Sequence, residues 1–297
     1  MPANLQLGVL YALVSGTLWG IGPLLLKRGM TLSNVSTATL TQQCVSVTTL
    51  TLIVVTQGDL FALTDLSARA FWAFVAAGAI GASFGKIFYY KGIDKVGASR
   101  SISVKNSSPI FTTVLAVAIL GENLTLAIAV GVVLIIIGIM VITRTEVRTE
   151  RGPSRVGYLF YPFMAAICFG INPIFKKIGV DATNLPTLGA LITQSTGLIM
   201  MLTAGRFLNI RPNWERVPSQ SLLFFSLAGI TEALASLFTF FALVYAPAVL
   251  VSPIWRISPL VTFVLAHFTL KGIEVVTVRD GVAASLIVGG VFVLSQS

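Results

Sequence analysis

Apolar residues occur along this chain in long blocks, which are separated by short polar segments. Each block holds about 18–23 residues, the length that an α-helix needs to cross ~30 Å of hydrocarbon. The blocks are apolar on all faces, whereas the strands of a membrane β-barrel alternate in polarity over ~10 residues. The pattern therefore predicts an all-α integral membrane protein.

The blocks predict ten transmembrane helices. We place them at residues 7–26, 36–57, 70–90, 98–119, 125–143, 157–175, 185–204, 220–244, 247–268 and 278–295. The connection that follows the fifth helix is rich in arginine and glutamate. It divides the chain into two predicted five-helix units, residues 1–146 and 147–297.

The two units repeat at a constant spacing. Trp19-Gly20-Ile21-Gly22-Pro23 in the first helix matches Phe169-Gly170-Ile171-Asn172-Pro173 in the sixth, an offset of 150 residues. The same offset relates Ser108-Pro109 to Ser258-Pro259. Five is an odd number, so the second repeat enters the membrane upside down. The sequence thus predicts inverted repeats, an architecture from which alternating access arises.

Composition excludes several classes of protein. The chain is 55% hydrophobic and 10% charged, against about 25% charged residues in soluble domains. Its two cysteines, Cys44 and Cys168, lie in separate predicted helices, and its single histidine is His267. Neither a disulfide framework nor a metal site follows from these residues, and we expect no cofactor. The net charge of +9 is explained by basic loops without invoking nucleic acid.

Basic residues are distributed unevenly between the two sides of the membrane. The loops after helices 1, 3, 5, 7 and 9 hold fourteen lysines and arginines, and the opposite loops hold three, Arg69, Lys176 and Lys177. Because cytoplasmic loops are enriched in basic residues, both termini are predicted to lie outside the cytoplasm. We expect a multi-pass protein of a bacterial or archaeal cytoplasmic membrane.

Several of these motifs resemble the drug/metabolite transporter superfamily, specifically its EamA-type members with ten helices. The resemblance rests on Trp19-Gly20 followed by Pro23 and Lys27, on Ser108-Pro109-Ile110-Phe111, and on Leu120-Gly121-Glu122. The second half departs from the last motif, because Leu270-Lys271-Gly272-Ile273-Glu274 displaces the acidic residue by two positions. The resemblance implies export or exchange of small metabolites through a central cavity.

Three ionisable residues lie deep within predicted helices, where a charge is costly and usually functional. They are Lys105, Arg256 and Glu232, and the 150-residue offset pairs Arg256 with Asn106 and Lys105 with Trp255. We predict that these residues bind substrate. The alternative is a structural ion pair between Arg256 and Glu232. Lys27, Arg28 and Lys86 lie nearer the predicted helix ends and are expected to reach the interface.

Four prolines are predicted hinges or kinks: Pro23, Pro109, Pro173 and Pro259. Pro109 and Pro259 each remove a backbone amide one turn after the candidate cations, which leaves carbonyl groups free beside the predicted site. Near these positions, Trp19 and Trp255 are candidate cavity walls, and Asn172 and Asn106 are further candidate ligands.

These residues predict a secondary transporter of a small anionic or zwitterionic metabolite such as an amino acid, because arginine pairs well with carboxylate or phosphate. An organic phosphate or carboxylate antiporter is the alternative, and a channel or scaffold is a more distant one. No nucleophile–base pair or metal cluster supports an enzyme. The expected partners are the substrate, the lipid bilayer and a coupling proton or counter-substrate.

Overall fold

The structure is a computed structural model and describes residues 3–30, 33, 35–96, 101, 104–145, 156–207, 217–269 and 278–296. These residues form helices and short connections, without a strand. The α-helices are α1 (Ala3–Gly29), α2 (Val35–Gln57), α3 (Ala68–Ala77), α4 (Lys86–Val96), α6 (Ser108–Leu120), α7 (Leu126–Thr145), α8 (Phe160–Thr183), α9 (Pro186–Phe207), α10 (Ser219–Tyr245), α11 (Ala248–Trp255), α12 (Ser258–Thr269) and α13 (Val278–Gln296). The short segments η2 (Asp59–Leu63) and η5 (Val156–Leu159) are 3₁₀ helices, and η3 (Gly78–Gly85) is a π-helix.

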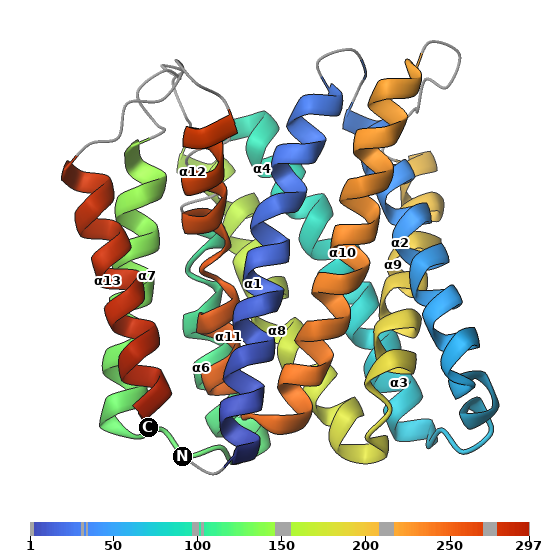
Figure 1. The fold of residues 1–297 in the computed structure, drawn as a ribbon, viewed down its shortest axis with the longest axis horizontal. Coiled ribbons are helices and arrows are strands. Elements are labelled where there is room, and N and C mark those ends of the chain that lie inside the picture. The colour runs from blue at the N-terminus through green and yellow to red at the C-terminus, as the bar shows by residue number, and fades with distance from the viewer. Residues whose placement is uncertain are drawn as a thin grey trace.

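These elements form the ten predicted membrane-spanning units. Within the described residues, five of the units are helices that are long and apolar enough to cross a bilayer. The third unit is the run α3–η3–α4, and the ninth is α11 followed by α12. Both described ends of the chain lie at the same end of the bundle, as an even number of crossings requires (Figure 1). We call this the terminal end.

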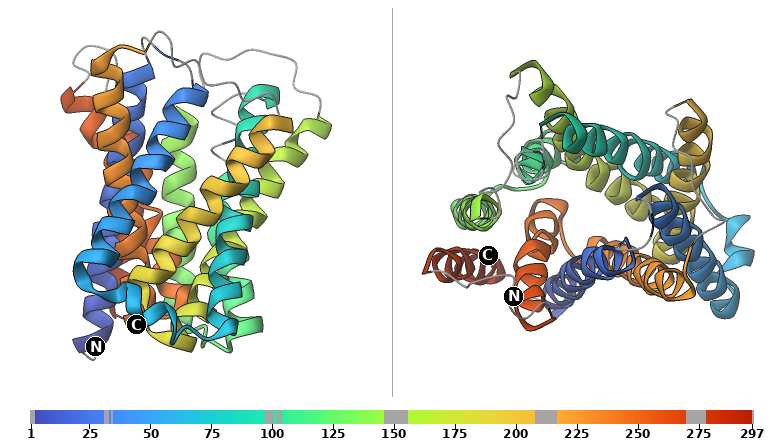
Figure 2. Two further views of the ribbon diagram at one scale, coloured as in Figure 1. Left: turned by 90° about the vertical axis from the view of Figure 1, so that its right-hand side faces the viewer. Right: turned by 90° about the horizontal axis from the view of Figure 1, so that it is seen from above.

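The helices form two layers, which are visible from above in Figure 2. In the first layer, α1 packs against α10 and against α11 and α12, and α2 packs against α10. In the second layer, α8 packs against α3, η3, α4 and α6, and α9 packs against η3. Helices α7 and α13 pack on each other beside the layers. Each layer therefore contains helices from both repeats.

Each layer contains one set of contacts between a helix of the first repeat and a helix of the second, and the two sets are equivalent. The Thr112 hydroxyl donates to the Gly170 carbonyl at 2.9 Å, and the Thr262 hydroxyl donates to the Gly20 carbonyl at 2.7 Å. A Cβ atom at Gly20 would lie 2.8 Å from the Ser258 carbonyl oxygen, and one at Gly170 would lie 2.9 Å from that of Ser108. These partners all differ by 150 residues, so the inverted repeat extends to individual hydrogen bonds.

The fourth and ninth membrane-spanning units are both interrupted at equivalent positions. Helical structure stops at residues 106–107 and at residues 256–257, and it resumes with α6 and α12. Tight turns close the breaks: the Ser107 amide donates to the Val104 carbonyl, and the Ile257 amide donates to the Ile254 carbonyl, each at 3.1 Å. Pro109 lies in the first turn of α6, and Pro259 directly follows Ser258 at the start of α12, where a missing amide is tolerated.

The structure corrects the predicted end of the sixth helix. Helix α8 continues to Thr183, so Lys176 and Lys177 lie within it and not in a loop. Lys176 is buried, and Lys177 donates to the Leu243 carbonyl at 2.9 Å. The connection at 146–155, the Leu270–Glu274 motif and Ser297 lie outside the described residues.

Candidate functional site

The two helix breaks place a pair of cations close to one aromatic ring. The Lys105 ammonium lies 5.7 Å from the centroid of the Phe169 ring, and the Arg256 guanidinium carbon lies 5.7 Å from the same centroid. Arg256 also donates to the Phe169 carbonyl over a long 3.5 Å, and Lys105 lies 4.6 Å from the centroid of Tyr89. The residues predicted at equivalent depth thus come together around α8.

Lys176 of α8 adds a third cation to this region. Its side chain is only 6% exposed, and its ammonium lies 5.1 Å and 5.6 Å from the centroids of Phe240 and Trp255. Its charge interacts with those of Arg256 and Lys86, which repel it, and with that of Glu232, which attracts it. No hydrogen bond to Lys176 is formed by any described residue.

Glu232 belongs to a separate buried network at the edge of these cations. Its Oε1 accepts from the Lys86 ammonium at 3.0 Å and from the Gln194 amide at 3.5 Å. Lys86 also donates to the Gln43 side chain at 2.9 Å, and Gln43 in turn donates to the Gln194 carbonyl at 3.1 Å. The network joins α2 and α10 of the first layer to α4 and α9 of the second.

This network excludes the alternative of an Arg256–Glu232 ion pair and corrects the expectation for Lys86. The partner of Glu232 is Lys86 and not Arg256, which contacts the Phe169 carbonyl instead. Lys86 does not reach the membrane interface either, because the helix continues beyond it to Val96 and its side chain is 19% exposed. We call the five charged residues together the central cluster: Lys86, Lys105, Lys176, Glu232 and Arg256.

Most polar groups left unpaired at the cluster are hydrogen-bond donors. Asn106 Nδ2 and Arg256 Nε are buried without a partner in the described part of the chain, and the ammonium groups of Lys105 and Lys176 contact only aromatic rings there. Glu232 Oε2 is the unpaired acceptor among the charged groups. Buried unpaired donors are costly, so the site is suited to a ligand that supplies acceptor oxygens.

The remaining predicted site residues lie nearby but have other contacts. The Asn172 amide donates to the Ala77 carbonyl at 2.7 Å, just before the π-helix η3, which joins α8 to α3. Trp19 is half-buried, and no hydrogen bond or ring contact links it to the cluster among the described residues. Helices α1 and α8 run without interruption through Pro23 and Pro173.

Sequence reasoning missed Lys176, Lys86 and Phe169 as members of this site. One available signal was the Lys176-Lys177 pair itself, because adjacent residues on a helix point about 100° apart and cannot both face the same surroundings. Another was the repeat, because Phe169 is the equivalent of Trp19, which was singled out. In the described residues, no three His, Cys, Asp or Glu side chains are grouped to hold a metal ion.

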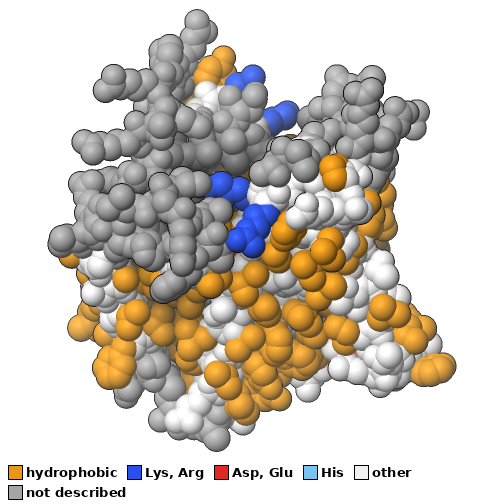
Figure 3. All heavy atoms as spheres, turned by 45° about the horizontal axis from the view of Figure 1, so that its top comes forward, with side chains coloured by type: hydrophobic (Ala, Val, Ile, Leu, Met, Phe, Trp, Pro, Cys, Tyr) orange, Lys and Arg blue, Asp and Glu red, His pale blue; other side chains and the backbone are white. Residues whose placement is uncertain are grey.

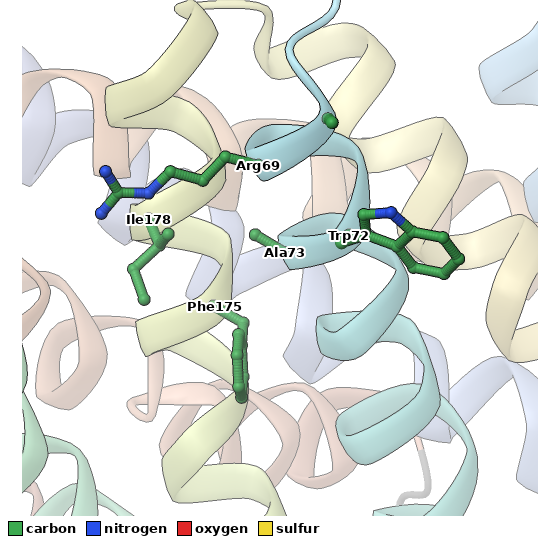
Figure 4. A pocket seen from close by; sticks show the side chains of 6 residues that line it. Arg69, Trp72, Ala73, Phe175 and Ile178 are labelled. Atoms are coloured by element: carbon green, nitrogen blue, oxygen red, sulfur yellow. The ribbon is translucent and has the colours of Figure 1, made fainter.

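Two surface features lie away from the cluster. A groove of about 400 Å³ between α3 and α8 is lined by Arg69, Trp72, Ala73, Phe175 and Ile178, with Arg69 extending over α8 (Figure 4). At the end opposite the terminal end, lysine and arginine side chains gather near the middle of the face (Figure 3). Lys27 and Lys91 are exposed at this end, on α1 and α4.

The comparison with known families decides the identity of the chain. The model of the EamA-like transporter family matches residues 6–144 and, a second time, residues 156–296. The chain belongs to the EamA-like transporter family. A solved structure titled "Crystal structure of protein" shares its fold, with a TM-score of 0.78 and 14% sequence identity over 97% of this chain and 96% of that one. No curated protein sequence matches the chain.

Family membership confirms the resemblance that the sequence motifs indicated. This EamA-like transporter is a multi-pass membrane protein built from two repeats, and its family consists of transporters and not of enzymes. A member of this family binds small-molecule substrates and lies in a lipid bilayer.

Proposed function

We propose that this chain is a secondary transporter of a small anionic metabolite, which binds at the central cluster. The observation that supports this is the set of unpaired donors: Lys105, Lys176, Asn106 and Arg256 all present N–H groups without an acceptor in the described residues. Carboxylate and phosphate oxygens form charge-assisted hydrogen bonds with such groups. Four cations face one carboxylate, which also favours an anion over a cation.

The engagement of Glu232 helps to rank the substrate classes. One of its oxygens is already bonded to Lys86, so it is less available for a substrate ammonium than the sequence alone suggested. An organic phosphate or carboxylate therefore fits the cluster better than an amino acid. Glu232 Oε2 has no hydrogen-bond partner in the described residues, and this keeps a zwitterion as the second candidate.

The mechanism that we propose is alternating access. Discontinuous helices from two inverted repeats meet near the middle of the bundle, which is where transporters of this design bind their substrates. The breaks at residues 106–107 and 256–257 lie beside Lys105 and Arg256. A coupling proton or a counter-substrate would complete the cycle.

A ligand screen tests the substrate class. Purified protein in detergent is heated with matched panels of organic phosphates, carboxylates, amino acids and lipophilic cations, because ligand binding to the folded state raises the melting temperature. We expect phosphates or carboxylates to stabilise the protein most, followed by amino acids. Stabilisation by lipophilic cations alone would contradict the proposal.

Arg256 provides the matching test by mutation. If its guanidinium binds an anion through two parallel N–H groups, Arg256→Lys keeps the charge but loses that geometry, and transport into liposomes should fall. Arg256→Ala should reduce transport further while the protein remains folded. Lys91→Gln, at an exposed position on α4, is the control and should transport normally. Normal transport by both Arg256 variants would make Arg256 a structural residue.

A further inference from the structure

Glu122 bonds to the backbone of the other repeat. Its two carboxylate oxygens accept hydrogen bonds from the amides of Ala248 and Val249, each at 2.7 Å. These amides begin α11, where the first N–H groups of the helix have no partner within the helix. The N-cap residue of α11 is Pro247, which has no side-chain oxygen to accept them. A carboxylate from a distant part of the chain therefore supplies the missing cap.

The Leu-Gly-Glu turn explains how Glu122 reaches this position. Gly121 ends α6 in the left-handed conformation, with φ at 66°, which favours glycine over residues with a side chain. The Glu122 amide then donates back to the Ala116 carbonyl at 3.2 Å. The chain reverses sharply at this point and the carboxylate is directed toward α11.

The Glu122 contact joins the two layers at the terminal end. Helix α6 belongs to the second layer and α11 to the first, and both lie in the half of the bundle that contains the termini (Figure 1). Lys177 makes a second contact of this kind, from α8 to the Leu243 carbonyl of α10. Ala248 and Val249 are at most 1% exposed and belong to the hydrophobic core. These contacts hold the two layers together at the terminal end.

We propose that Glu122 is the latch of a gate at the terminal end. Opening this end separates α6 from α11, so the Glu122 carboxylate has to release the two amides. Helix α11 ends at Trp255 and is followed directly by Arg256. The Glu122 contact at the start of this helix therefore also sets the position of both residues in the binding site. This inference depends on the chain being a transporter, but it does not depend on the charge of the substrate.

Two buried serines offer matched reporters for the gate. Ser252 lies on α11, one turn beyond the latch, and Ser101 lies in the corresponding part of the fourth membrane-spanning unit, toward the opposite end. Both are at most 1% exposed, and neither hydroxyl has a hydrogen-bond partner in the described residues. Ser→Cys at either position is nearly isosteric. The background carries Cys44→Ser and Cys168→Ala, and a membrane-impermeant maleimide is applied to vesicles from one side at a time.

We expect Glu122→Gln to open the terminal end. The glutamine keeps the size of the side chain but loses the charge and one acceptor, and loss of a hydrogen bond to a charged group shifts an equilibrium roughly tenfold or more. Labelling of Ser252→Cys from the terminal side should rise by about that factor, without substrate present. Labelling of Ser101→Cys from the other side should fall or stay the same, because the two ends do not open together.

A control and a conservative variant separate a latch from a general loss of stability. Asp65→Asn makes the same chemical change at an exposed position on the terminal side and should leave both labelling rates unchanged. Glu122→Asp keeps the charge with a shorter reach and should give an intermediate rate at Ser252→Cys. The proposal is overturned if Glu122→Gln and Glu122→Asp leave the Ser252→Cys rate unchanged, or if they raise the rates at both reporters together.

Discussion

Replacing Lys176 by methionine distinguishes a binding residue from a structural one, because the two roles predict opposite changes in stability. The Lys176 side chain is 6% exposed, and its ammonium has no hydrogen bond from the described residues. Removing an ammonium from water costs several kcal/mol, whereas contacts with two aromatic rings return about 0.5–2 kcal/mol each. Methionine has an unbranched side chain whose sulfur packs well against rings such as Phe240 and Trp255.

We therefore expect Lys176→Met to unfold at a higher temperature and to transport poorly. Replacing a buried ion pair by apolar residues of similar volume can stabilise a protein by about 1–4 kcal/mol, and we expect a gain of this order here because the Lys176 ammonium has no hydrogen-bonded partner among the described residues. At about 2–4 °C per kcal/mol for a domain of this order of size, the melting temperature should rise by several degrees. Melting is measured in detergent, and exchange of a labelled anion is measured in liposomes.

The matched control is Lys91→Met. Lys91 is an exposed lysine on α4, so its replacement relieves no buried charge, and both stability and transport should remain close to those of the parent protein. The reasoning is refuted if Lys176→Met melts at a lower temperature and still transports at the normal rate. Lys176 would then stabilise the fold through its ring contacts and have no part in substrate binding.

Two further predictions concern the remaining charges. Glu232→Gln breaks the buried pair with Lys86 and should cost about 3 kcal/mol or more of stability, most of which the double variant with Lys86→Gln should restore. Anion exchange should persist in the single variant if it folds. Loss of exchange at unchanged stability would mean that Glu232 binds a substrate ammonium group. Loss of proton-driven accumulation alone would mean that Glu232 carries a coupling proton. The distribution of basic residues predicts that Ser297 is outside the cytoplasm, so a C-terminal phosphatase fusion should be active and a fluorescent-protein fusion dark. The reverse pattern would overturn the orientation but not the inverted repeat.

Much of the fold could be predicted because membrane crossing imposes a length and the repeat imposes a period. The apolar blocks gave the ten membrane-spanning units, and the shared Ser-Pro pairs at residues 108–109 and 258–259 marked both helix breaks. Within the site, Lys105 and Arg256 could be singled out for a similar reason, since few forces other than function keep a cation at that depth.

The pairing of the charges could not be predicted, because it depends on how each helix is rotated and where it ends. Hydropathy alone places Lys86 near a membrane interface. The π-helical segment before it and the helical residues after it put its ammonium beside Glu232. Hydropathy also places Lys176 in a loop, because it falls at the lysine pair. Helix α8 nevertheless continues for seven residues beyond Lys176, to Thr183.

Under the alternating access that we propose, the constant offset of 150 residues lets one chain adopt two arrangements of its helices. When the two repeats exchange conformations, this arrangement is converted into the one that opens to the other side of the membrane. In that arrangement the places now held by Lys86 and Glu232 fall to Ser236 and Ala82, which cannot form an ion pair. Under this mechanism the two arrangements are unequal in energy, and we expect a preferred resting side that a change at the Lys86–Glu232 pair should reverse or weaken.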